Sequence, residues 1–146
     1  MTLKNWESNG WLKSHSSSKQ EIEQLLQIVD RDIKDSKQTD LSPDWRFGIA
    51  YNAALKLCTI LLYSEGFMAE RSATHYRTIQ SLSLILGKER EDDADYLNTC
   101  RAKRNMVEYD SVGGATDAEA DELIDFVGNL KDDVLKWLKI NHPEYL

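Results

Sequence analysis

The chain has 146 residues, of which 41% are hydrophobic and 29% are charged. This length and composition favour a single soluble domain over residues 1–146, large enough to bury a core of its own. The formal net charge of −7 excludes the broad basic surface on which nonspecific nucleic-acid binders depend. Any contact with RNA or a nucleotide must therefore come from a local cluster of basic residues.

Three features of the sequence set the expected compartment. No run of about 18 apolar residues occurs, so we expect no membrane span. The N-terminal residues lack the apolar centre of a signal peptide. Cys58 and Cys100 lie in apolar settings on separate predicted helices, which favours two buried free thiols over a disulfide. We therefore expect a cytoplasmic protein.

The N-terminal segment, residues 1–16, is predicted to be an arm that docks on the rest of the chain. It contains Trp6 and Trp11, and a short helix interrupted at Gly10 would bring both rings onto the body. The alternative is an arm that embraces a partner subunit. Residues 18–140 are expected to form the helical bundle itself.

The first two long helices have clear start signals. Ser18 followed by Glu21 is a capping box, and apolar residues then recur at helical spacing to about Lys37. The next helix begins at Pro43, runs to about Glu65 and is apolar on most sides, which is typical of a buried central helix.

A shorter helix is expected next, capped by Ser72 or Thr74 and running through Leu86. Leu84 and Ile85 lie off its main apolar stripe. That wider apolar surface predicts a second contact, such as one with another copy of the chain in a homodimer.

Two more helices complete the predicted bundle. One runs from Lys88 to about Glu108, with acidic residues in its first turns, where they complement the positive end of the helix dipole. The other begins with a second capping box, formed by Thr116 and Glu119, and ends near Asn141. The expected fold is therefore all-α, an antiparallel up-and-down bundle of four to five helices.

The usual metal and nucleophile motifs are not found in the sequence. His15, His75 and His142 lie on three different segments with no metal-ligand spacing, so we expect no metal and no cofactor. Cys100 shares an apolar stripe with its neighbours, which indicates packing in the core and not nucleophilic catalysis.

The densest basic cluster lies near the end of the helix expected over residues 88–108. With Arg101 at zero on a helical wheel, Arg104 lies at about −60° and the neighbouring polar residues extend to about +80°. The apolar stripe of the same helix lies near −120°. Convergent guanidiniums, an amide and a phenol suit the recognition of phosphate or a nucleobase. The candidate ligand-binding residues are Arg101, Arg104, Asn105, Glu108 and Tyr109. The alternative is an exposed helix end whose cations merely favour the dipole.

The segment Arg104-Asn105-Met106-Val107-Glu108-Tyr109 resembles the R-N-x-x-x-H signature of the HEPN superfamily (higher eukaryotes and prokaryotes nucleotide-binding domain). The order of segments over about residues 18–140 is also similar. The resemblance implies a helical bundle that forms a homodimer with the two Arg motifs meeting at the interface. It also implies, for many members, a metal-independent RNase in which Arg stabilises phosphate charge and His transfers protons. Some members are toxins of toxin–antitoxin pairs whose partner is a small nucleotidyltransferase.

This chain has Tyr109 where the signature has His, and an unperturbed phenol, with a pKa of about 10, is a poor base near neutral pH. We therefore expect a HEPN-like module that binds a nucleotide, RNA or a partner protein without catalysis. The alternative is a metal-independent endoribonuclease, the toxin of such a pair, with Arg104 and Tyr109 as its catalytic residues. His75, which in the family only opens the preceding helix, is a further alternative as a spatial substitute for the missing histidine. A structural dimer with no ligand is a third interpretation.

Overall fold

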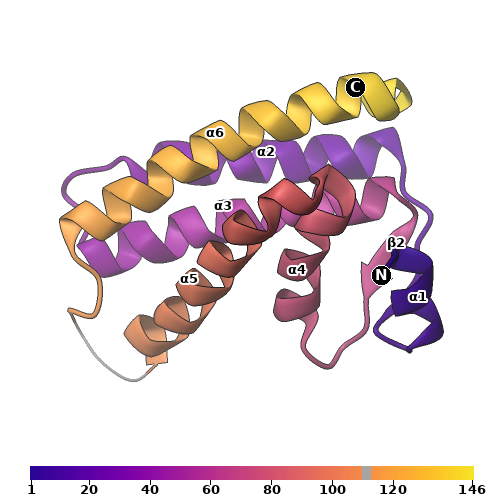
Figure 1. Cartoon of the computed structure of the whole chain (residues 1–146). Helices are drawn as coiled ribbons and strands as arrows, with labels where there is room; N and C mark the ends of the chain where they lie inside the picture. Colours follow the sequence, from indigo (N-terminus) through magenta and orange to yellow (C-terminus); the bar gives the residue numbers. More distant parts are fainter. Residues whose placement is uncertain (110–112) are drawn as a thin grey trace.

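Six α-helices, two 3-10 turns and one short two-stranded sheet make up the part of the chain that the computed structural model describes, residues 1–109 and 113–146 (Figure 1). Side chains are described for all of these residues except 107–109. The fold is an all-α helical bundle, as the hydrophobic periodicity predicts. In chain order its elements are α1 (Leu3–Ser8), β1 (Leu12–Ser14), α2 (Lys19–Ser36), α3 (Pro43–Ser64), β2 (Phe67–Ala69), α4 (Thr74–Leu86), η1 (Lys88–Arg90), α5 (Glu91–Tyr109), α6 (Asp117–Asn141) and η2 (Pro143–Tyr145).

The helix α3 is the centre of the bundle and contacts α2, α4, α5 and α6. Its apolar side chains point in most directions, and Leu57, Ile60 and Leu61 are completely buried. Among the described residues, α3 is the one helix long and apolar enough to cross a membrane, yet 72% of its most apolar stretch is buried inside the fold. It is therefore accounted for as a core helix, as the sequence predicts.

Two layers of helices cover α3. In Figure 1, α2 and α6 lie side by side on one side of α3 and run in opposite directions, whereas α4 and α5 lie on the other side and diverge. Arg46 of α3 is only 8% exposed and connects α3 to both α2 and α6. Its Nε donates to the Ser36 carbonyl at 2.9 Å, and its terminal nitrogens pair with Asp117 and Asp121 of α6. The charge of this buried guanidinium is thus compensated by two carboxylates.

The predicted helix start signals hold at three positions. Ser18 and Ser42 each accept a hydrogen bond from a backbone N–H in the first turn of α2 and α3. Only this half of the capping box predicted at Ser18 is formed, because the Glu21 carboxylate instead contacts His15 and Ser17. Thr116 and Glu119 form the reciprocal capping box at the start of α6. The helix expected from Lys88 instead begins with the 3-10 turn η1 and becomes α-helical at Glu91.

The predicted cap of α4 at Ser72 or Thr74 is wrong. The residue before the helix is Ala73, in the left-handed region with a φ of 56°. The Thr74 hydroxyl donates backwards to the carbonyls of Glu70 and Arg71. Thr74 is already the first residue of α4, so its hydroxyl does not lie at the cap position from which it could accept from the free N–H groups of the helix.

The N-terminal arm docks on the body of its own chain. β1 pairs antiparallel with β2, with Leu12 opposite Ala69 and Ser14 opposite Phe67. The sequence predicts neither strand. Trp6 and Leu12 are buried and pack with Phe67 in a second apolar cluster. Ordering the arm therefore extends the core beyond the bundle.

The arm also covers the apolar surface that suggests a dimer contact. Leu84 and Ile85 of α4 are partly buried against the cluster that the arm completes. The guanidinium of Arg77 lies over the Trp11 ring, 3.7 Å from its centroid, which fixes the arm to α4 by a cation–π contact. Packing within one chain thus accounts for these residues, and the homodimer stays a prediction.

Candidate functional site

The basic residues of α5 lie on a face that is partly buried. Ala94 and Leu97 are 0% exposed, and Arg101 and Arg104 follow them at helical spacing on the same side of the helix. The helical wheel predicts a polar face for these arginines, with Arg104, at about −60°, at the border with the apolar stripe and half-buried. Both arginines are half-buried in the structure. The prediction for Arg104 is confirmed, whereas that for Arg101 is wrong because the fold covers a second side of α5. The side with Ala94 and Leu97 faces α3 and α4.

Two residues from other helices meet the arginines on this side. Tyr51 of α3 is 1% exposed, and the guanidinium of Arg104 lies 5.7 Å from the centroid of its ring. His75, in the first turn of α4, places its Nδ1 3.3 Å from the Tyr51 hydroxyl. We refer to Tyr51, His75, Arg101 and Arg104 as the basic cluster. It joins three helices that are far apart in the sequence.

The electrostatics of the basic cluster favour a neutral imidazole. Burial lowers the pKa of His75 below its usual range, and the positive charges of Arg104, Lys56 and Arg101 lower it further. Burial raises the pKa of Tyr51, against the opposing effect of Arg101 and Arg104. The phenol thus keeps its proton at neutral pH. When it donates that proton to Nδ1, the imidazole carries its own hydrogen on Nε2.

His75 differs in this respect from the other two histidines. His15 Nε2 lies 2.7 Å from a carboxylate oxygen of Glu21, and His142 Nε2 lies 3.4 Å from one of Glu65. His75 instead has cationic neighbours, which disfavour its imidazolium form. Of the three, His75 is the one set among cations.

The other predicted site residues have different positions. Arg101 donates from Nε to Asn98 Oδ1 at 3.0 Å, which orients its guanidinium within the cluster side of α5. Asn105 is exposed to solvent. The side chains of Glu108 and Tyr109 lie outside the description. The structure therefore brings Arg101 and Arg104 together with Tyr51 and His75, which are not among the candidate ligand-binding residues predicted from the sequence.

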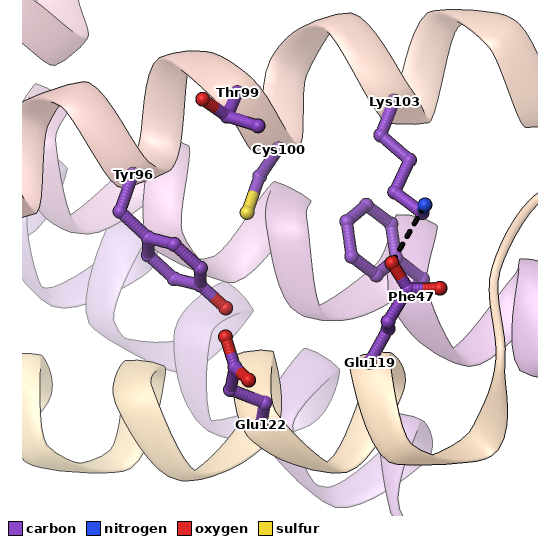
Figure 2. Close-up of a pocket in the computed structure, with 7 residues that line it drawn as sticks. All are labelled: Phe47, Tyr96, Thr99, Cys100, Lys103, Glu119 and Glu122. Atoms are coloured by element: carbon purple, nitrogen blue, oxygen red, sulfur yellow. Dashed lines mark ion pairs between the residues drawn. The ribbon is translucent and has the colours of Figure 1, made fainter.

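The opposite side of α5 faces α6. Figure 2 shows Lys103 reaching toward Glu119, with Phe47 beside the pair, and Tyr96 pointing toward Glu122. Lys103 Nζ lies 2.7 Å from Glu119 Oε2. The remaining hollow has a volume of about 80 Å³. Lys103 thus lies away from the two arginines, and its charge is compensated by α6.

Cys100 lies on the side of α5 that faces α6 and is unsuited to nucleophilic chemistry. It is 3% exposed, and burial raises its pKa to about 11. Cys58 is completely buried and its pKa is raised to about 12 by the same cause. The thiolate is the reactive form of cysteine, so both thiols are held in their unreactive form at neutral pH. Both cysteines are free, as predicted.

Among residues 1–109 and 113–146, no group of three or more His, Cys, Asp and Glu side chains is arranged to hold a metal ion. Comparisons with protein-family models, curated proteins and solved structures found no match to this chain. The functional argument therefore depends on the basic cluster and on what surrounds it.

Proposed function

We propose that this protein is a HEPN-like helical module that binds a nucleotide or RNA through Arg101 and Arg104. One observation carries the proposal: three cations act on a single half-buried imidazole in a protein whose net charge is −7. A phosphate carries the opposite charge and is attracted to such a group of cations. Guanidiniums bind phosphate oxygens through paired, charge-assisted hydrogen bonds.

The rest of the proposed site follows from the family resemblance. Asn105, Glu108 and Tyr109 would extend the phosphate-binding surface along the end of α5. The proposed module acts in the cytoplasm as a homodimer whose two basic clusters approach one another. A protein partner that offers a phosphate or carboxylate to the same arginines would use the same chemistry.

The binding experiment compares two substitutions on one helix. Arg104→Gln and Lys103→Gln each remove one positive charge from α5, but from opposite sides. Fluorescence anisotropy with labelled single-stranded RNA, and calorimetry with ATP, would measure the Kd of each variant. We expect Arg104→Gln to weaken binding at least about tenfold and to reduce its salt dependence, because it removes a phosphate contact. Lys103→Gln should stay near wild type. Unchanged binding in Arg104→Gln would contradict the proposal.

A second candidate is favoured by the position of His75. A neutral imidazole beside two guanidiniums has the composition of a metal-independent RNase site, with His75 supplying the proton transfer that Tyr109 does not. In that reaction His75 would carry its hydrogen on Nδ1, donated to the Tyr51 hydroxyl oxygen, so that Nε2 is the basic nitrogen. Nε2 then takes the proton of a ribose 2′-hydroxyl while that hydroxyl oxygen bonds to the adjacent phosphorus. The bond from phosphorus to the 5′-oxygen breaks, and that oxygen takes a proton from water. The toxin role with a nucleotidyltransferase partner belongs to this candidate.

The same variants separate the two candidates when cleavage is measured beside binding. Bulk RNA is incubated with wild type, Arg104→Gln, Lys103→Gln and His75→Asn, and growth is followed on expression. An RNase would lose cleavage in Arg104→Gln and His75→Asn but keep it in Lys103→Gln. Absence of cleavage and of toxicity in the wild type, together with RNA binding, would leave the binding module as the function.

A further inference from the structure

Arg104 also lines a depression on the surface between α2, α3 and α5. The depression has a volume of about 250 Å³ and includes Trp45, Ile49 and Asn52 of α3 together with Arg31 of α2. It is smaller than the roughly 300–1,000 Å³ of pockets that enclose whole drug-sized ligands, so its size suits a single flat ring system.

An exposed tryptophan stands at this depression. Trp45 is 62% exposed, whereas Trp6, in the arm, is 7% exposed. Trp45, Ile49 and Asn52 follow one another at helical spacing along one face of α3, and Gly48 between them contributes no side chain that would fill the space. An indole that keeps most of its surface in water next to such a space is a stacking platform for a planar ligand.

The polar groups of the depression are held in fixed positions. Asp32, whose side chain is 7% exposed, accepts from Asn52 Nδ2 at 2.6 Å and from Arg31 Nε at 3.0 Å. This carboxylate therefore orients the amide that lines the floor and the guanidinium that lines one side. Arg31, whose charge Asp32 balances, and Arg104 both line the space around the indole.

We propose that this depression is a nucleobase subsite: Trp45 stacks on the base of a nucleotide whose phosphate is held by Arg104 and the basic cluster. The inference rests on the proposed function, and it adds the recognition of a base to the binding of phosphate. The ligand class is a nucleotide unit, either free or within single-stranded RNA. Arg104 is the link, because it borders both the depression and Tyr51.

The experiment separates the base from the phosphate. Binding is measured for a short labelled oligoadenylate, for an abasic oligomer of the same length, and for AMP and ATP, by anisotropy and by quenching of tryptophan fluorescence. Trp45→Ala removes the ring and Trp45→Phe keeps a smaller one. Ile140→Ala, at a residue 79% exposed on α6, is the control for losing an exposed apolar side chain. Arg104→Gln reports on the phosphate.

We expect Trp45→Ala to weaken oligoadenylate binding about tenfold or more, and Trp45→Phe to weaken it less, since stacking follows the size of the ring. Neither should alter binding of the abasic oligomer, whereas Arg104→Gln should weaken both oligomers and Ile140→Ala neither. If AMP and ATP bind as tightly as the oligoadenylate, the ligand of the site is a free nucleotide. If AMP and ATP bind much more weakly than the oligoadenylate, the ligand is RNA.

Three results would overturn the subsite. Oligoadenylate binding that is lost in Arg104→Gln but unchanged in Trp45→Ala would leave the phosphate site standing without a base subsite. Binding unchanged in both variants, or absent in the wild type, would remove the proposed function as well. Self-association that Trp45→Ala abolishes, with no change in RNA binding, would show that the indole contacts protein.

Discussion

The two sides of α5 place their cations beside different neighbours. On the side toward α6, Lys103 lies 2.7 Å from Glu119, next to a hollow of about 80 Å³. On the side toward α3 and α4, Arg101 and Arg104 lie with Lys56 near an imidazole that burial and these charges keep neutral. The same helix thus carries an ion pair with α6 and, within three residues of it, two arginines that act on His75. The comparison shows that a basic run becomes a candidate site through its tertiary neighbours, not through its composition.

The largest expected effect is on the free energy of unfolding, when a buried apolar side chain is removed from the side of α5 that carries the basic cluster. Leu97 is completely buried one turn before Arg101. We expect Leu97→Ala to lower the free energy of unfolding by about 2–5 kcal/mol, because it removes buried methyl groups and leaves a cavity. Urea denaturation followed by circular dichroism would measure this loss. Thr99→Ala, at an exposed position of the same helix, should change the free energy by about 0.5 kcal/mol or less. Similar losses in the two variants would show that α5 does not pack on this side as described.

An intermediate effect is expected on the pKa of His75, which tests the comparison directly. Arg104 is the first of the charges that lower it, after burial. Arg104→Gln should therefore raise the pKa of His75 toward the ordinary value of about 6.5, whereas Lys103→Gln should leave it unchanged. NMR titration of the three histidine rings would measure this, with His75→Asn assigning the signal.

The sign of the linked stability effect follows from the same lowered pKa. At pH values between the lowered pKa of His75 and the ordinary histidine pKa, the unfolded chain binds a proton at His75 that the folded chain does not. Stability should thus fall as pH drops from the ordinary histidine pKa toward the lowered one, and His75→Asn should reduce that fall. A pKa of His75 that moves equally in Arg104→Gln and Lys103→Gln would contradict the placement of the cluster.

The smallest effect is expected from breaking the compensated pair. The side chains of Lys103 and Glu119 are 25% and 43% exposed, so water screens their attraction. We expect Lys103→Gln to lower the free energy of unfolding by less than about 1 kcal/mol in the same urea experiment. The contact also lowers the pKa of Glu119, so this small contribution is present above the ordinary Glu pKa and is lost as pH falls below it. A loss comparable to that of Leu97→Ala would mean that the pair is a main support of α5.

Much of the fold could be read from local signals. Ser18, Ser42 and Thr116 start helices as predicted, and Gly66, with a φ of +91°, ends α3 where the sequence places its end. Such caps depend on residues within one turn, so they are visible in the chain. The start of α4 was not predicted correctly. Thr74 lies inside the helix, and its hydroxyl donates to carbonyls of the preceding turn. The strand pairing of the arm was missed because its partner lies more than 50 residues away.

For the candidate site, too, some features could be predicted from the sequence and others could not. The sequence by itself determined the helices, their caps, the buried character of α3 and the concentration of cations at the end of α5, because periodicity and capping act over one or two turns. Only the tertiary structure decided which side of α5 holds the candidate site. Leu97 and Arg101 lie on one wheel face either way, but the packing of α5 against α3 and α4 buries that face and adds Tyr51 and His75 to it. Burial and charge depend on neighbours that are distant in sequence, so the neutral imidazole among cations exists only in the folded chain.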